Sequence, residues 1–197
     1  ALGGTLHVVN GTVTIGDAAD ENIEMAGGCI LVDGGALDVS GNMFVRSIND
    51  VGIYKQGGGV VTVSRIGSGS TVYAPFHLTG AGSVFEMSGG TIIVPAEGGA
   101  GAQGLGFYSE VTPGFVTGGT LQLGDAGSPA NQSIGLSSAH PIGALIVNSS
   151  NVVANIASDL TILGDVQVNA GTLTANNHTL DVGGNWQNTN VFNYNSS

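Results

Sequence analysis

The sequence predicts an all-β fold, specifically a right-handed parallel β-helix (β-solenoid) of about seven coils. A short glycine-led cassette returns seven times, other short runs alternate between apolar and polar residues, and glycine supplies 35 of the 197 residues. Units this short cannot each bury an apolar core, so their regular recurrence indicates a stack of repeats. The right-handed sense follows from the strong preference of crossovers between parallel strands.

Each cassette consists of a glycine, a small residue, an apolar residue, any residue and a second apolar residue. Apolar side chains therefore recur with the period of two that is typical of a strand. Glycine opens the strand because a corner often needs a positive φ or a close backbone approach. The cassettes begin at Gly4, Gly35, Gly59, Gly90, Gly119, Gly143 and Gly171, so each coil should contain roughly 24–31 residues.

Stacking the seven cassettes in order predicts which side chains face the interior. The inward positions are Leu6, Leu37, Val61, Ile92, Leu121, Leu145 and Leu173, together with Val8, Val39, Val63, Val94, Leu123, Val147 and Ala175. The outward position between them holds His7, Asp38, Thr62, Ile93, Gln122, Ile146 and Thr174. In this register Asp38 lies between His7 and Thr62, and no ladder of acidic residues forms.

Alternating runs between the cassettes predict one or two further strands in each repeat, joined by Gly, Asn, Ser and Asp corners. These runs cover residues 12–15, 29–32, 72–73, 83–87, 160–163, 166–168 and 179–182. We expect residues 1–197 to form a single β-solenoid segment. Neither end shows a distinct polar capping unit, which predicts a fragment of a longer repetitive protein.

The charge is sparse and one-sided, with 14 acidic residues against three basic ones and a formal net charge of −11. Such a surface repels nucleic acid and anionic membranes, so neither is expected as a partner. No apolar stretch approaches the roughly 20 residues that span a bilayer, so we expect no membrane insertion. The single cysteine, Cys29, lies in an apolar run, and we expect it to be a small buried side chain.

Several phrases in the C-terminal part of the chain resemble the repeat segments of very large, adhesin-like secreted surface proteins of Bacteroidota. They are residues 118–124, 141–148, 159–166 and 183–188, the last containing the distinctive Gly-Gly-Asn-Trp. The resemblance implies an extracellular, cell-surface location and export by the type IX secretion system. It also implies that the partners are the secretion machinery, other cell-surface proteins or glycans.

We therefore expect a structural or adhesive stalk segment with no catalytic, cofactor-binding or metal-binding residues of its own. The alternative is part of a carbohydrate-active parallel β-helix, a polysaccharide lyase or hydrolase. Such an enzyme needs carboxylates, often with Arg or Lys, on neighbouring coils of one face. The basic residues are Arg46, Lys55 and Arg65, and Arg46 or Lys55 near Asp50 is interpreted as a surface charge pair.

The densest acidic group, Asp17, Asp20, Glu21 and Glu24, lies in an expected corner loop. Flexible carboxylate loops bind Ca²⁺, but this one lacks the spaced Asp and Asn pattern and the central glycine of known calcium loops. A solvated loop is the preferred interpretation, and calcium binding is the alternative. The four histidines, His7, His77, His140 and His178, lie too far apart to show the spacing of zinc ligands.

Overall fold

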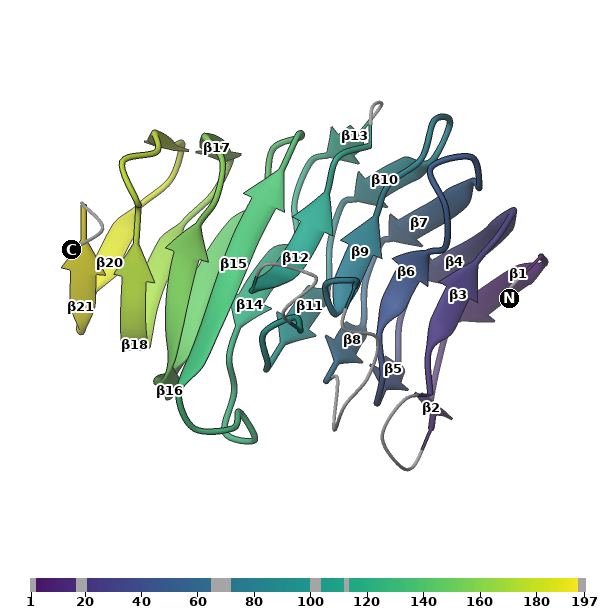
Figure 1. Cartoon of the computed structure of the whole chain (residues 1–197), viewed down its shortest axis with the longest axis horizontal. Coiled ribbons are helices and arrows are strands. Elements are labelled where there is room, and N and C mark those ends of the chain that lie inside the picture. Colours follow the sequence, from purple (N-terminus) through teal and green to yellow (C-terminus); the bar gives the residue numbers. More distant parts are fainter. Residues whose placement is uncertain (1–2, 17–20, 65–71, 100–103, 112–113, 195–197) are drawn as a thin grey trace.

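The computed structural model describes residues 3–16, 21–64, 72–99, 104–111 and 114–194. Within these ranges the chain is all-β, as predicted, with 21 strands and no helix (Figure 1). The strand pairings are parallel throughout the described sheets. The described segments include no helix of the length and apolar character needed to cross a membrane.

The strands up to β15 form three rows, because each strand from β1 to β12 pairs with the strand three places further along the chain. The first row is β1 (Thr5–Val8), β4 (Gly28–Val32), β7 (Gly52–Gln56), β10 (Val84–Met87) and β13 (Gly114–Val116). The second row is β2 (Thr12–Ile15), β5 (Ala36–Val39), β8 (Val60–Val63), β11 (Thr91–Val94) and β14 (Thr120–Leu123). The third row is β3 (Ile23–Met25), β6 (Met43–Val45), β9 (Phe76–Leu78), β12 (Leu105–Ser109) and β15 (Gln132–Ser138).

A long strand, β16 (Ala144–Ile156), joins the second and third rows into one sheet. Its first part pairs with β14 and its second part with β15, so one strand continues both rows. The remaining strands are β17 (Leu160–Ile162), β18 (Val166–Thr174), β19 (Leu180–Val182), β20 (Trp186–Asn188) and β21 (Val191–Asn193). The strand β18 repeats the arrangement of β16, and it pairs with β20 and β21 through its two parts.

Five of the seven cassettes stack in the predicted register. Ala36 pairs with Val60, Val60 with Thr91, Thr91 with Thr120, and Thr120 with Ala144. Each of these residues directly follows a cassette glycine, so the second row repeats at the same intervals as the glycines from Gly35 to Gly143.

The predicted stacking of the first and last cassettes is wrong. Thr5 pairs with Cys29 of the first row, and Asp38 lies opposite Thr14 and Thr62, so His7 is not beside Asp38. In the last cassette, Thr172 pairs with Val153 in the second part of β16. The cassette pattern describes a corner glycine followed by a strand, and this combination occurs in more than one row.

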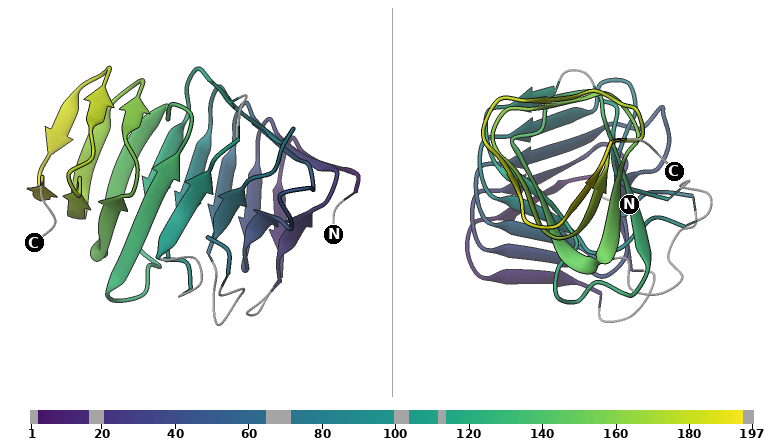
Figure 2. Two further views of the ribbon diagram at one scale, coloured as in Figure 1. Left: turned by 45° about the horizontal axis from the view of Figure 1, so that its top comes forward. Right: turned by 90° about the vertical axis from the view of Figure 1, so that its left-hand side faces the viewer.

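The repeat shortens toward the C-terminus and falls below the predicted range. Leu145 pairs with Val166, and Val166 pairs with Trp186, so both steps are shorter than any interval between successive cassette glycines. Seen end-on, the yellow C-terminal part encloses a smaller, three-sided outline than the wider N-terminal part (Figure 2). The interior therefore narrows along the molecule.

One connected apolar cluster extends from Val8 to Leu173 and fills the space between the rows. In the wider part of the interior, the rings of Phe76 and Phe107 stack with their centroids 4.7 Å apart. The ring of Tyr54 packs edge-on against Phe76. The narrow C-terminal part is filled by aliphatic side chains such as Val166 and Leu173. Smaller side chains thus accompany the shorter repeats.

The expected burial of Cys29 is wrong. Its neighbours in β4, Gly28 and Ile30, are buried, whereas Cys29 occupies the alternate, outward position and is partly exposed. Partial burial against the neighbouring strands raises the pKa of its thiol. An unbroken apolar run hides the alternation from sequence reasoning, because outward and inward residues then look alike.

Candidate binding groove on the first row

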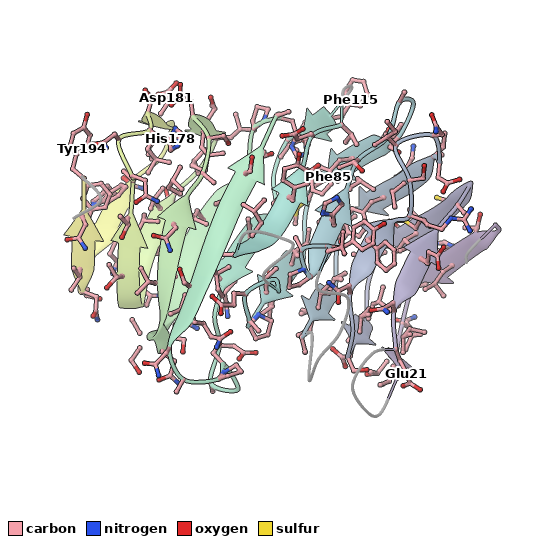
Figure 3. The ribbon with its side chains drawn as sticks, viewed as in Figure 1. Glu21, Phe85, Phe115, His178, Asp181 and Tyr194 are labelled. Atoms are coloured by element: carbon pink, nitrogen blue, oxygen red, sulfur yellow. The ribbon has the colours of Figure 1, made fainter. Side chains whose placement is uncertain are left out.

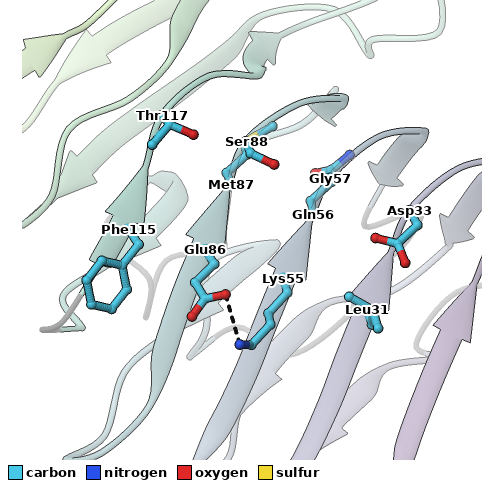
Figure 4. A pocket seen from close by; sticks show the side chains of 10 residues that line it. All are labelled: Leu31, Asp33, Lys55, Gln56, Gly57, Glu86, Met87, Ser88, Phe115 and Thr117. Carbon is cyan, nitrogen blue, oxygen red and sulfur yellow. Dashed lines mark ion pairs between the residues drawn. The ribbon is translucent and has the colours of Figure 1, made fainter.

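The outer face of the first row carries a column of four side chains with different chemistry. Leu31 pairs with Lys55, Lys55 with Glu86, and Glu86 with Phe115, so β4, β7, β10 and β13 contribute one residue each. The residues on either side of each outward side chain point into the core, since side chains alternate along a strand. Figure 4 shows the four side chains in order across the sheet.

A second column follows at the corner where these strands end. It consists of Asp33, Gly57, Ser88 and Thr117. Each backbone nitrogen in this column donates to a carbonyl of the preceding strand in the row, at 2.9 Å in all four cases. The corner residues are therefore held in register with the strands.

Together the two columns line an open groove with a volume of about 320 Å³. Gly57 forms a notch in it, because a Cβ at this position would lie 3.2 Å from Asp33 Oδ1 and 3.9 Å from Ser88 Oγ. The floor behind the notch is formed by Gln56, whose side chain is buried and held on both sides. It accepts a hydrogen bond from the Tyr54 hydroxyl at 2.6 Å, and it donates to the Gly58 and Gly59 carbonyls. These bonds make the floor rigid.

Charges of both signs lie side by side in the groove. Lys55 Nζ is 2.8 Å from Glu86 Oε2, and His7 Nε2 is 2.8 Å from Asp33 Oδ2 at one end. The hydrogen bond to Glu86 raises the pKa of the Lys55 ammonium, so Lys55 stays protonated at neutral pH and cannot serve as a base. The groove therefore offers donors and acceptors together and no concentrated charge.

An aromatic side chain closes the other end of the groove. Phe115 is 57% exposed and, within the described part of the chain, packs against no other ring. In Figure 3 it projects at the edge of the molecule, whereas Phe85 lies in the interior. The exposed hydroxyl groups of Ser88 and Thr117 lie between Phe115 and the notch.

Sequence analysis treated Lys55 only as a surface charge and missed Leu31, Glu86 and Phe115, although a signal for all four was present. Leu31, Lys55, Glu86 and Phe115 each lie four positions before a cassette glycine, and they recur at the same intervals as those glycines. The cassettes resemble one another closely and are therefore easy to recognise. The four residues before them differ in chemistry, and they belong to the first row, where they form a column of their own.

The structure separates the basic residues that sequence analysis considered together. Arg46 Nε lies 3.2 Å from Asp50 Oδ2 and 3.3 Å from Glu24 Oε1, so the predicted charge pair with Asp50 is confirmed for Arg46. Lys55 contacts Glu86 of the next strand instead of Asp50. Arg65 lies outside the described residues.

Half of the acidic group at residues 17–24 is outside the described residues, namely Asp17 and Asp20. Of the other half, Glu24 belongs to β3 and forms the ion pair with Arg46. Among the residues that the structure describes, no three histidine, cysteine or acidic side chains converge as metal ligands. Calcium binding by the whole group stays untested.

A second set of polar side chains lies inside the molecule. The Ser109 hydroxyl is 2.7 Å from His140 Nε2, and His140 Nδ1 donates to the Pro141 carbonyl at 3.0 Å. Because Nδ1 carries the proton, Nε2 accepts from Ser109, which is the hydrogen-bond pattern of an activated nucleophile. Ser109 is fully buried and the adjoining cavity measures only about 10 Å³, so the pair has no room for a substrate.

A row of rings lies on the outer face of the third row. Phe44 stacks on Tyr73 at 4.2 Å, Tyr73 contacts His77, and His77 contacts Tyr108. Burial lowers the pKa of His77 to about 4, so its imidazole is neutral at physiological pH. These rings pack mainly on one another, whereas Phe115 in the groove is left available.

Comparison with known proteins gives no relative from which a function could be carried over. No protein-family model, no curated protein and no solved structure matches this chain.

Proposed function

We propose that the chain is a right-handed parallel β-helix that serves as a non-catalytic structural or adhesive stalk segment of a secreted cell-surface protein. The observation that carries this proposal is the continuous inner ladder of the second row. Leu37, Val61, Ile92, Leu121 and Leu145 lie on successive strands, and none is more than 2% exposed. Each strand in the ladder is hydrogen-bonded on both sides, which resists separation of the repeats.

The repeated corners of the C-terminal part support the likeness to secreted repeat proteins. Residues 164–166 and 184–186 occupy equivalent places, because Val166 pairs with Trp186. At this corner the backbone nitrogen of Asn185 donates to Asp165 Oδ1 at 2.7 Å. The Gly-Gly-Asn-Trp phrase is thus a repeated corner followed by a strand, and we propose on this basis a Bacteroidota surface protein exported by type IX secretion.

The proposal is tested by locating the protein on intact cells of its source. An antibody against residues 1–197 should label unbroken cells, and external protease should remove the label. A mutant lacking type IX secretion should retain the protein inside. Labelling that requires cell lysis would overturn the surface location, and unchanged export in the mutant would overturn the route.

The second candidate function, a carbohydrate-active β-helix, is favoured by one observation. Lys55 and Glu86 lie on neighbouring strands of one outer face, and Asp33 lies at the corner that directly follows β4, so carboxylates and a cation are gathered on one side as such enzymes require. Incubation with acidic and neutral polysaccharides should yield no new reducing ends and no unsaturated sugars if the segment is non-catalytic. Turnover that is lost in both Lys55→Ala and Glu86→Gln would establish the enzyme instead.

A further inference from the structure

We propose that the groove on the first row binds a short, uncharged oligosaccharide that lies across β4, β7, β10 and β13. In this arrangement one sugar ring stacks on Phe115, and hydroxyl groups of the next sugars bond to Glu86, Ser88 and Asp33. The inference deepens the adhesive part of the proposed function and rests on it for its biological setting. The binding site itself is argued from the groove alone.

The exposed ring of Phe115 lies at one end of the groove. This phenyl group is 57% exposed, and polar side chains line the groove beside it. The faces of pyranose sugars carry C–H groups that pack well against the negative face of an aromatic ring. A ring at one end of a polar groove therefore suits a ligand that is apolar on its faces and polar at its edges.

The groove carries charges of both signs in balance. A sugar hydroxyl both donates and accepts, and the ion pair of Lys55 and Glu86 presents a donor and an acceptor 2.8 Å apart. The hydroxyls of Ser88 and Thr117 make no protein hydrogen bond within the described residues, so they are available to a ligand. Acidic sugars would meet the carboxylates of Asp33 and Glu86 and a protein of net charge −11.

The dimensions of the groove also suit a short oligosaccharide. The groove crosses three strand spacings, which corresponds to about 14 Å, and its volume of about 320 Å³ lies at the lower end of small-ligand sites. A protein partner needs an interface of about 800 Å² on each side, which a single groove of this volume does not supply. A linear oligosaccharide of a few sugars fits the length and the width.

The notch at Gly57 gives a selective way to block the groove. Its φ lies outside the left-handed region, so a larger residue is compatible with the backbone conformation. A valine there would occupy the space between Asp33 and Ser88 on the outer face, where it disturbs no core contact. Phe115→Ala removes the stacking surface from the other end, and Val153→Ala, a truncation of an exposed residue on a different row, is the matched control.

The test uses the purified chain and isothermal titration with hexasaccharides of β-1,4-linked glucose, mannose and xylose, and with hexagalacturonate as the acidic probe. At least one neutral probe should bind with a Kd of about 1 mM or tighter. Phe115→Ala and Gly57→Val should each weaken its binding at least tenfold, and Val153→Ala should leave it unchanged. Thermal melting of each variant checks that the fold is kept.

Three outcomes would overturn the inference: no neutral probe binds, hexagalacturonate binds more tightly than all neutral probes, or binding survives in both groove variants. The proposed function is tested separately by surface labelling of cells. If the chain is a surface stalk without a glycan site, the antibody labels intact cells but no oligosaccharide binds to the purified chain. If it is a glycan-binding protein from another compartment, an oligosaccharide binds but intact cells are not labelled. Intact probes recovered after titration distinguish binding from turnover.

Discussion

The Nε2 atom of His140 accepts a hydrogen bond of 2.7 Å from the Ser109 hydroxyl in the interior of the molecule. Ser109 is the last residue of β12 and His140 follows β15, and the imidazole also stacks on Phe85 with a centroid distance of 4.4 Å. Burial lowers the pKa of His140 below its usual 6.5, so the ring is neutral at physiological pH in the folded protein. This neutral state makes the fold sensitive to acid.

The first prediction concerns this sensitivity. Burial lowers the folded-state pKa of both His140 and His77, the latter to about 4, whereas an unfolded histidine titrates near 6.5. Below pH 6.5 the unfolded chain binds more protons than the folded one, so stability falls as the pH falls. Between pH 7 and pH 5, His77 alone should cost up to about 2 kcal/mol of unfolding free energy.

Urea unfolding at pH 7 and pH 5 measures this effect. His77→Gln should reduce the difference between the two pH values. The control is His178→Gln, which changes a partly exposed histidine 3.5 Å from Asp159. Equal pH dependence in the wild type and His77→Gln would contradict the prediction.

The second prediction tests which side of a strand faces the core. Leu121→Asp places a carboxylate in the inner ladder between Ile92 and Leu145, where no partner is available, and should cost several kcal/mol. Gln122→Asp changes the next residue of the same strand, which faces outward and donates to the Gly124 carbonyl at 2.8 Å, and should cost only about 1 kcal/mol. Chemical denaturation measures both, and a similar loss in the two variants would refute the register.

The third prediction tests a corner glycine. Gly59 has a φ of 70°, and a Cβ there would lie 2.7 Å from the Gly35 carbonyl oxygen of the neighbouring repeat. Gly59→Ala should therefore cost about 1–3 kcal/mol from backbone strain, with the close contact adding to it. Gly57→Ala is the control, because its φ is ordinary and its nearest neighbour is a movable side chain. Comparable melting temperatures for the two variants would show that the corner does not require glycine.

The fourth prediction concerns calcium. If the carboxylates at residues 17–24 are solvated, Ca²⁺ at about 1 mM should leave the melting temperature nearly unchanged. A site with a Kd of about 10 µM would instead add about 2.7 kcal/mol at this concentration. Scanning calorimetry with and without Ca²⁺ measures the difference, and a stabilisation that disappears in Asp17→Asn/Asp20→Asn would demonstrate a calcium site.

Much of the candidate groove could have been predicted from the sequence. The intervals between Gly35, Gly59, Gly90 and Gly119 also relate Leu31, Lys55, Glu86 and Phe115, so a fixed offset from the cassettes identifies the outer column. The local alternation shows the outward side only for Glu86, which lies between Phe85 and Met87. Leu31, in the unbroken apolar run of β4, is placed on the same side only by its alignment with that column. Once these residues are aligned in one column, the ion pair of Lys55 with Glu86 and the notch at Gly57 can also be predicted.

The contacts of His7 and Ser109 could not be predicted in this way. His7 belongs to the first row and bonds to Asp33, although its cassette looks like those of the second row. Ser109 approaches His140 because β12 and the segment after β15 are neighbours in space. No local pattern in the sequence predicts this proximity.

The sequence by itself determined that this chain is all-β, where most of its strands begin, and which residues of the central cassettes are buried. These properties depend on the period of two and on corner glycines, which act over a few residues. Only the tertiary structure decided which row each strand joins, how β16 merges two rows, and how the repeat shortens toward the C-terminus. The physical reason is that a strand offers the same backbone hydrogen bonds to any neighbour, so its partner is chosen by how side chains from all three rows fill the shared interior.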